Sequence, residues 1–102
     1  MDPEMTMYLK TYKTEKNLMV AVCDKELIGR KLMHGDVVIE ITESYYKGEP
    51  ADESEIIDAL MQATTANIFG QKAVSCAVKA GIVDEDSILM IEDVPHALYF
   101  TL

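Results

Sequence analysis

The chain has 102 residues, of which 49% are hydrophobic and 26% are charged, and these values argue against a disordered protein and against a membrane protein. Its longest apolar run, Leu18 to Cys23, is far shorter than the ~20 residues of a membrane-spanning helix. The first residues, MDPEMT, are acidic where a signal peptide is basic. We therefore expect a cytoplasmic protein, with residues 1–6 as a flexible tail and residues 7–102 as a single domain.

The net charge of -9 is unevenly distributed along the chain. Residues 1–51 carry a charge of -2 and residues 52–102 a charge of -7, whereas the segment 8–31 is locally basic at +3. A phosphate-bearing partner would therefore have to contact this basic segment.

Two strands open the expected domain. Met7 to Lys13 and Leu18 to Cys23 are separated by a short polar break, which predicts a hairpin. The second strand is apolar on both faces and is expected inside a sheet. Asp24 then suits the N-cap of one helical turn, Lys25 to Ile28.

The next segment contains one expected strand between two irregular stretches. Arg30 to Gly35 is interpreted as a loop, and Asp36 to Thr42 alternates apolar and polar residues like a half-buried strand. Glu43 to Ala51 is rich in turn residues and includes Pro50, which predicts a connection that does not continue as a strand.

Two helices are expected in the second half. Asp52 at an N-cap with Glu55 three residues later predicts a capping box, and the helix that follows has the apolar stripe Ile56, Ile57, Leu60 and Met61. Thr64 or Thr65 is predicted to cap a further helical turn through Phe69. After Gly70, the second helix runs from Gln71 to Ala80 and ends at Gly81.

Two more strands close the chain. Ile88 to Ile91 is apolar on both faces and is predicted to be an interior strand. Glu92 to His96 forms a turn around Pro95, and Ala97 to Leu102 is the last strand. The order of elements predicts an α+β fold, in which a mixed or antiparallel sheet of about five strands carries two main helices on one face in a two-layer arrangement.

Neither a metal site nor a cofactor is indicated. Cys23 and Cys76 lie in apolar segments without a CxxC partner, which favours buried free thiols. The acidic turn Asp84-Glu85-Asp86 lacks the other oxygen ligands of a calcium loop. His34 and His96 have no third ligand at a suitable spacing.

A few polar residues are candidates for function. His96 follows a proline, so its ring is held in place, which suits either a general base or a hydrogen bond that fixes a loop. Asn67 would either cap a broken helix or face a groove. Tyr45 and Tyr46, followed by Lys47, resemble a platform on which nucleobases stack, although half-buried tyrosines at a strand end are common.

Several segments together resemble an archaeal family known as domain of unknown function 424. They are Cys23-Asp24, Leu27-Ile28-Gly29, Tyr46 with Gly48-Glu49, Asn67 to Val74, and Val94-Pro95-His96-Ala97. The resemblance implies a single α+β domain and an association with translation and RNA-related genes. The family has two glycines before Val94, where this chain has Glu92 and Asp93, and this difference disfavours anion binding by bare backbone.

Two functions of different class remain open. The first is a non-catalytic interaction module that docks on an RNA or a basic protein of the translation apparatus. The second is a small enzyme with a pocket between helix and sheet that uses His96 and Asn67. The module is favoured, because catalysis needs more converging polar groups than these two. The candidate binding residues are Arg30, Lys31, Tyr45, Tyr46, Asn67, Gly70, Pro95 and His96.

Overall fold

A computed structural model describes residues 5–101. The expected tail therefore lies mostly outside the described residues, as does Leu102 at the end of the last predicted strand. The chain folds around a six-stranded sheet with the order β5-β1-β2-β6-β8-β7. These strands are Glu49–Ala51 (β5), Met7–Lys13 (β1), Leu18–Asp24 (β2), Thr65–Phe69 (β6), Val94–Phe100 (β8) and Leu89–Ile91 (β7).

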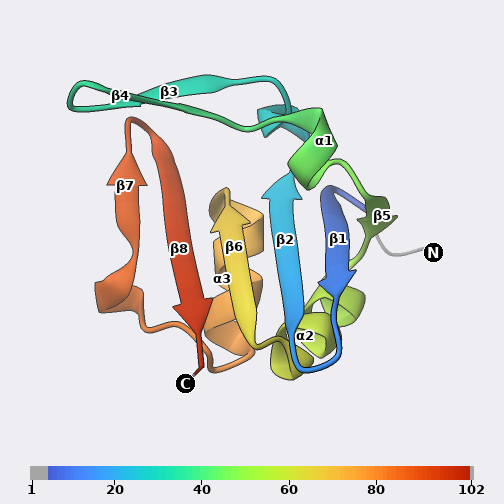
Figure 1. The fold of residues 1–102 in the computed structure, drawn as a ribbon. Coiled ribbons are helices and arrows are strands. Elements are labelled where there is room, and N and C mark those ends of the chain that lie inside the picture. Colours follow the sequence, from blue (N-terminus) through green and yellow to red (C-terminus); the bar gives the residue numbers. More distant parts are fainter. Residues whose placement is uncertain (1–4, 102) are drawn as a thin grey trace.

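The sheet is mixed. Only β2 and β6 run parallel, and all other neighbours are antiparallel. The connection between the parallel pair includes α2 (Glu53–Gln62), and α3 (Gln71–Lys79) follows β6. Both helices pack behind the sheet in the view of Figure 1. The α+β fold with a mixed sheet and helices on one face is therefore confirmed, with six strands in the sheet.

A second, two-stranded ribbon lies across one end of the sheet (Figure 1). It consists of β3 (Lys31–His34) and β4 (Val37–Glu40), and α1 (Glu43–Tyr46) connects it back to β5. The single-turn 3-10 helices η1 (Lys25–Leu27) and η2 (Glu85–Ser87) precede β3 and β7.

Alternation along the strands divides the core in two. On the helix side, Val20, Val22 and Ile68 of the central strands pack under Ile56 and the small residues of α3. On the other side, a smaller cluster forms where the ribbon meets the sheet. It contains Ala21, Cys23, Leu27, Leu32, Ile41, Tyr46, Phe69, Ile91 and Val94.

Several expected elements are confirmed. The β1–β2 hairpin forms in register, with Met7 opposite Asp24. At the start of α2, Asp52 accepts from the Glu55 backbone and the Glu55 side chain accepts from the Asp52 backbone, which completes the capping box.

Other expected elements are wrong. Thr65–Phe69, expected as a helical turn, is the central strand β6, because its β-branched and aromatic residues suit a buried strand between β2 and β8. Arg30 to Gly35, expected as a loop, contains β3, which pairs with β4 away from the main sheet. Pro50 lies within β5, where an edge position tolerates its missing N–H.

Two expectations near the C-terminus also need correction. The segment Ile88 to Ile91 contains β7, which is an edge strand rather than an interior one. Pro95 lies inside β8 and not in a turn. The turn is Glu92-Asp93, and Glu92 adopts a positive φ of 56°.

Candidate functional site

The sheet face opposite α2 and α3 is only partly covered, because the ribbon and α1 lie over one end of it. We call this surface the open face. Its side chains come from alternate strand positions and include Tyr8, Lys10 and Tyr12 of β1, Met19 of β2, Thr65, Asn67 and Phe69 of β6, His96, Leu98 and Phe100 of β8, and Leu89 of β7.

The open face carries no acidic side chain from any of the six described strands, although the chain has 18 acidic residues. The one acidic residue on the neighbouring β5, Glu49, pairs with Leu9 and so points to the helix side. Asp24, at the end of β2, also points to the helix side. The negative charge is therefore concentrated on helices, turns and edges.

A continuous row of aromatic rings crosses this face. Tyr12 stacks on Tyr45 at 5.7 Å between ring centroids, Tyr45 meets Tyr46 edge-on at 4.7 Å, and Tyr46 meets Phe69 at 5.7 Å. Phe69 in turn stacks on the imidazole of His96 at 4.1 Å. Burial raises the pKa of the Tyr46 hydroxyl, so Tyr46 is a packing residue, whereas Tyr12, Tyr45 and His96 are half-buried.

His96 and Asn67 form a hydrogen-bonded pair in the middle of the open face. The His96 Nε2 lies 3.0 Å from the Asn67 Oδ1. With Nε2 as the donor, Nδ1 is an acceptor. Partial burial lowers the pKa of His96 below its ordinary value, so the ring is neutral at neutral pH and has one unprotonated nitrogen.

Beyond this pair the open face is apolar and exposed. Leu98 is 62% exposed and Phe100 is 70% exposed, and Leu89 of β7 lies directly opposite His96. Large apolar side chains that gather on one exposed face mark interaction surfaces more often than isolated ones do. The one basic residue of these strands on this face is Lys10, whose ammonium lies 5.5 Å from the centre of the Tyr12 ring.

A second polar cluster lies on the helix side, where the parallel strands end. Asp24 is buried and accepts from the backbone N–H groups of Lys72 (3.2 Å) and Ala73 (2.9 Å). The prediction that Asp24 caps the turn Lys25 to Ile28 is therefore wrong, since its side chain makes no such bond and caps α3 instead. Burial raises the pKa of Asp24, and the two backbone N–H bonds oppose this rise.

Gly70 makes this contact possible. It has a φ of 112°, and a Cβ on it would lie 2.4 Å from the Asp24 Cγ. A small cavity of about 230 Å³ opens beside this cap and is also lined by Arg30 and Pro95. The Arg30 guanidinium pairs with Asp93 at 3.3 Å. Because Asp24 already occupies the N-terminus of α3, the place where an anion would bind is filled.

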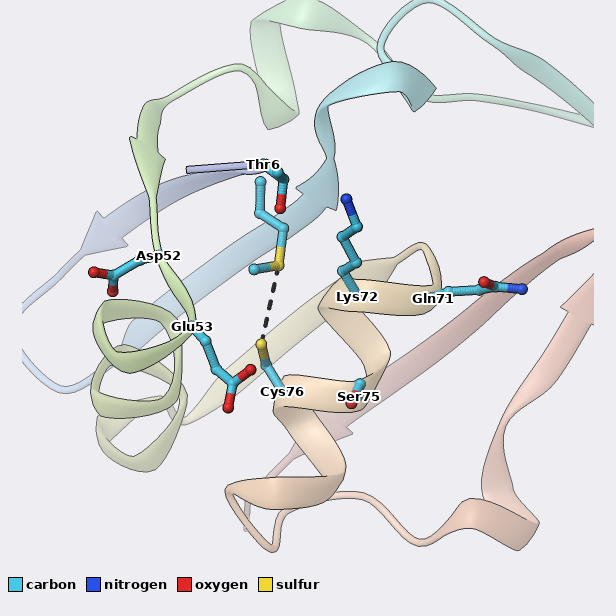
Figure 2. Close-up of a pocket in the computed structure, with 8 residues that line it drawn as sticks. Thr6, Asp52, Glu53, Gln71, Lys72, Ser75 and Cys76 are labelled. Carbon is cyan, nitrogen blue, oxygen red and sulfur yellow. Dashed lines mark hydrogen bonds between the residues drawn. The ribbon is translucent and has the colours of Figure 1, made fainter. Parts of the chain in front are cut away.

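A larger recess of about 520 Å³ lies between β1 and the first turns of α2 and α3 (Figure 2). Its polar groups point in different directions. Asp52 caps α2, and Glu53 pairs with Lys79. The sulfur of Cys76 lies 3.9 Å from the sulfur of Met7, and the dashed line from Cys76 in Figure 2 marks this contact. Burial raises the pKa of the Cys76 thiol to about 11. The recess therefore has no converging catalytic groups.

The structure divides the candidate residues identified from the sequence into two groups. Tyr45, Tyr46, Asn67 and His96 come together on the open face through Phe69. Gly70, Pro95 and Arg30 lie around the Asp24 cap instead. Lys31 is exposed on β3, on the side opposite the buried Leu32.

Sequence reasoning missed four residues of these sites. Phe69, Leu98 and Phe100 could have been found from the alternation of strands β6 and β8, had Thr65–Phe69 been interpreted as a strand. The role of Asp24 had no local signal, because its partners on α3 are far along the chain.

The described part of the chain offers little support for a reactive cysteine, a metal site or a membrane-spanning helix. Both cysteines are buried and free, as expected, and burial raises the pKa of the Cys23 thiol to about 12. Within residues 5–101, His, Cys, Asp and Glu form no cluster of three that would hold a metal ion. Over the same residues, none of the helices combines the length and the apolar character needed to cross a bilayer.

Comparison with known proteins adds a family and a fold relative. Residues 12–102 match the model of a family described as "Protein of unknown function (DUF424)". A crystal structure of an uncharacterized conserved protein from Methanopyrus kandleri is similar, with a TM-score of 0.77 and 27% identity over 90% of this chain and 88% of that one. No curated protein matches the chain.

Proposed function

The chain belongs to the family described as a protein of unknown function (DUF424), and that description names no activity. From the site itself we propose that the protein is a non-catalytic module of the cytoplasm that binds single-stranded RNA on the open face. The observation that carries this proposal is the composition of that face. It is aromatic and apolar, and its strands contribute no acidic side chain in a chain with a net charge of -9.

Each part of the open face suits one part of a nucleotide. Phe100 and Leu98 offer exposed area on which bases stack, which is worth about 1–3 kcal/mol per base for an aromatic side chain. His96 and Asn67 lie beside Leu98 and offer half-buried hydrogen-bonding groups, where the edge of a base would be recognised. Lys10 supplies a positive charge for a phosphate.

Electrostatics limit the affinity of this module. Arg30 pairs with Asp93 and Lys31 lies on the outer side of the ribbon, so the locally basic segment does not form one patch beside the open face. We expect stacking to dominate and salt dependence to be shallow, because each phosphate contact to a single strand contributes a slope of only about -0.7. The resemblance to the family implies a link with translation, so we propose translation-associated RNAs as the first natural candidates.

The catalytic alternative has less support. His96 bonds to an amide and stacks on Phe69, whereas a general base that acts with a nucleophile needs that nucleophile within hydrogen-bond reach and a group that orients the ring. Asn67 can orient the His96 ring, but the pair supplies no nucleophile.

A pair of matched variants tests the proposal. Leu98→Glu places a carboxylate on the open face, and Met61→Glu makes the same charge change at an equally exposed site on α2, since the two side chains are 62% and 66% exposed. Leu98→Glu should lower the affinity for labelled ten-nucleotide oligouridylate and oligoadenylate roughly ten-fold, as expected for the loss of one stacked base. Met61→Glu should lower the same affinities less than two-fold.

Fluorescence anisotropy at low salt measures both affinities, and thermal melts confirm that both variants fold. Equal losses in the two variants would contradict the proposal, as would the absence of binding by the wild-type chain. The second result would favour the other partner class, a basic protein bound to the acidic surface.

A further inference from the structure

The edge strand β7 has the side-chain pattern of an interior strand. Leu89 points to the open face and Met90 to the helix side, and both are exposed, Met90 by 54%. Met90 also lines an apolar groove of about 640 Å³ beside α3, together with Ile88 and Val78. In Figure 1, β7 is the outermost strand of the sheet, next to β8 alone. Both faces beside this edge therefore offer apolar contacts.

The backbone of β7 is also open for pairing at its centre. Ile91 and Val94 flank the turn Glu92-Asp93, so they form the hydrogen-bonded pair of a tight hairpin, and the next pair, Met90 with Pro95, is the non-hydrogen-bonded one. The Pro95 carbonyl accordingly accepts from Gly70 on the β6 side, at 2.9 Å. The N–H and C=O of Met90 therefore point away from the sheet.

Acidic residues flank this edge at both ends. Asp84, Glu85 and Asp86 precede β7, and Glu92 and Asp93 follow it. Arg30 offsets the charge of Asp93 alone. Two copies of β7 related by a twofold axis would pair antiparallel and bring the acidic start of one against the acidic end of the other. Charge repulsion therefore disfavours a second copy of this chain and favours a strand with basic ends.

We propose that β7 is a docking edge that adds one strand from a protein partner. That strand is an extended apolar segment of another chain, with lysine or arginine on both sides of it. Its backbone pairs with Met90, one of its faces covers Leu89, and the other fills the groove beside α3. This edge adjoins the open face, with which it shares Leu89, but the proposal does not depend on RNA binding.

Three short peptides serve as probes. All have a core of alternating valine and threonine; the first has lysines at both ends, the second has glutamates there, and the third has lysines with a central proline that removes one backbone donor. Heteronuclear NMR titration measures their binding, and amide hydrogen exchange measures the protection of Met90. We expect the first peptide to bind at least about ten-fold more tightly than the other two and to slow exchange at Met90.

Two matched substitutions localise the effect. Met90→Lys and Met33→Lys make the same charge change at residues that are 54% and 51% exposed, but Met33 lies on the ribbon. We expect Met90→Lys to abolish measurable binding of the first peptide and Met33→Lys to change it by less than about two-fold. Equal effects of the two substitutions would overturn the proposal. Equal binding of the three peptides, or unchanged Met90 exchange at the highest concentration of the first, would also overturn it.

Discussion

The buried carboxylate of Asp24 should contribute more to stability than an ordinary helix cap. Asp24→Ala removes acceptors 2.9 Å from the Ala73 N–H and 3.2 Å from the Lys72 N–H. Loss of a cap costs typically about 1 kcal/mol, and leaving a buried donor without a partner costs about 1–3 kcal/mol. We therefore expect a loss of about 2–4 kcal/mol, which lowers the melting temperature of a domain of this size by about 10–30 °C.

Asp52 provides the matched control, because it also caps a helix, accepting from the Glu55 N–H at 2.9 Å. It is only half-buried, so water can replace its side chain, and Asp52→Ala should cost about 1 kcal/mol or less. Urea unfolding followed by circular dichroism gives both free energies of unfolding. Equal costs for the two aspartates would refute the claim that burial makes Asp24 special.

A double variant of Gly70 and Asp24 tests whether these two residues contact each other. Gly70→Ala should destabilise by about 2–4 kcal/mol, because φ is 112°, a region that costs other residues about 1–3 kcal/mol, and because the new Cβ meets the Asp24 carboxyl. In the double variant with Asp24→Ala that clash is absent. Its total cost should be smaller than the sum of the single costs by about 1 kcal/mol or more, whereas additive costs within about 0.5 kcal/mol would mean that the two residues do not contact each other.

Three further predictions concern the titration of His96, the burial of the cysteines and the order of the strands. Burial lowers the pKa of His96, so below about pH 6.5 the unfolded chain binds a proton at this residue more readily than the folded chain does. The free energy of unfolding should therefore fall as the pH drops below that value, and it should fall more steeply in the wild type than in His96→Gln. At pH 8 the substitution His96→Gln itself should cost about 1 kcal/mol or less. Cys23 and Cys76 are buried with raised pKa values, so a thiol reagent should label them in urea and only slowly in the native protein; rapid native labelling would contradict their burial. Amides of the central strand β6 should exchange far more slowly than that of Met90 on the β7 edge, and equal rates would contradict the strand order.

The predictable part of the fold is the part with local signals. Hairpin spacing located β1 and β2, and Asp52 with Glu55 located the start of α2, because these patterns depend on residues close in sequence. The segment Thr65–Phe69 has no such signal. Five residues are too few to distinguish period 2 from period 3.6, and its position between β2 and β8 is decided by tertiary packing.

The same distinction applies to the candidate site. His96 and Asn67 could be singled out by residue type, and the structure joins them through the register of β6 and β8, where Asn67 pairs with Leu98 and Phe69 with His96. That register cannot be derived from the sequence, because the pattern of Thr65–Phe69 predicts a helical turn and not a strand. The edge position of β7 could not be predicted either, because apolar residues on both faces of a strand are typical of an interior strand.

The most direct test of the open face is an NMR titration of the isotope-labelled chain with single-stranded oligouridylate. Shift changes show which side of the sheet meets the ligand. We predict that they concentrate on β6 and β8, with the side chains of His96, Leu98 and Phe100 most affected, and extend to Lys10. Changes confined to α2, α3 or the β7 edge, or no changes at all at saturating oligonucleotide, would contradict the proposal that the open face is the RNA-binding surface.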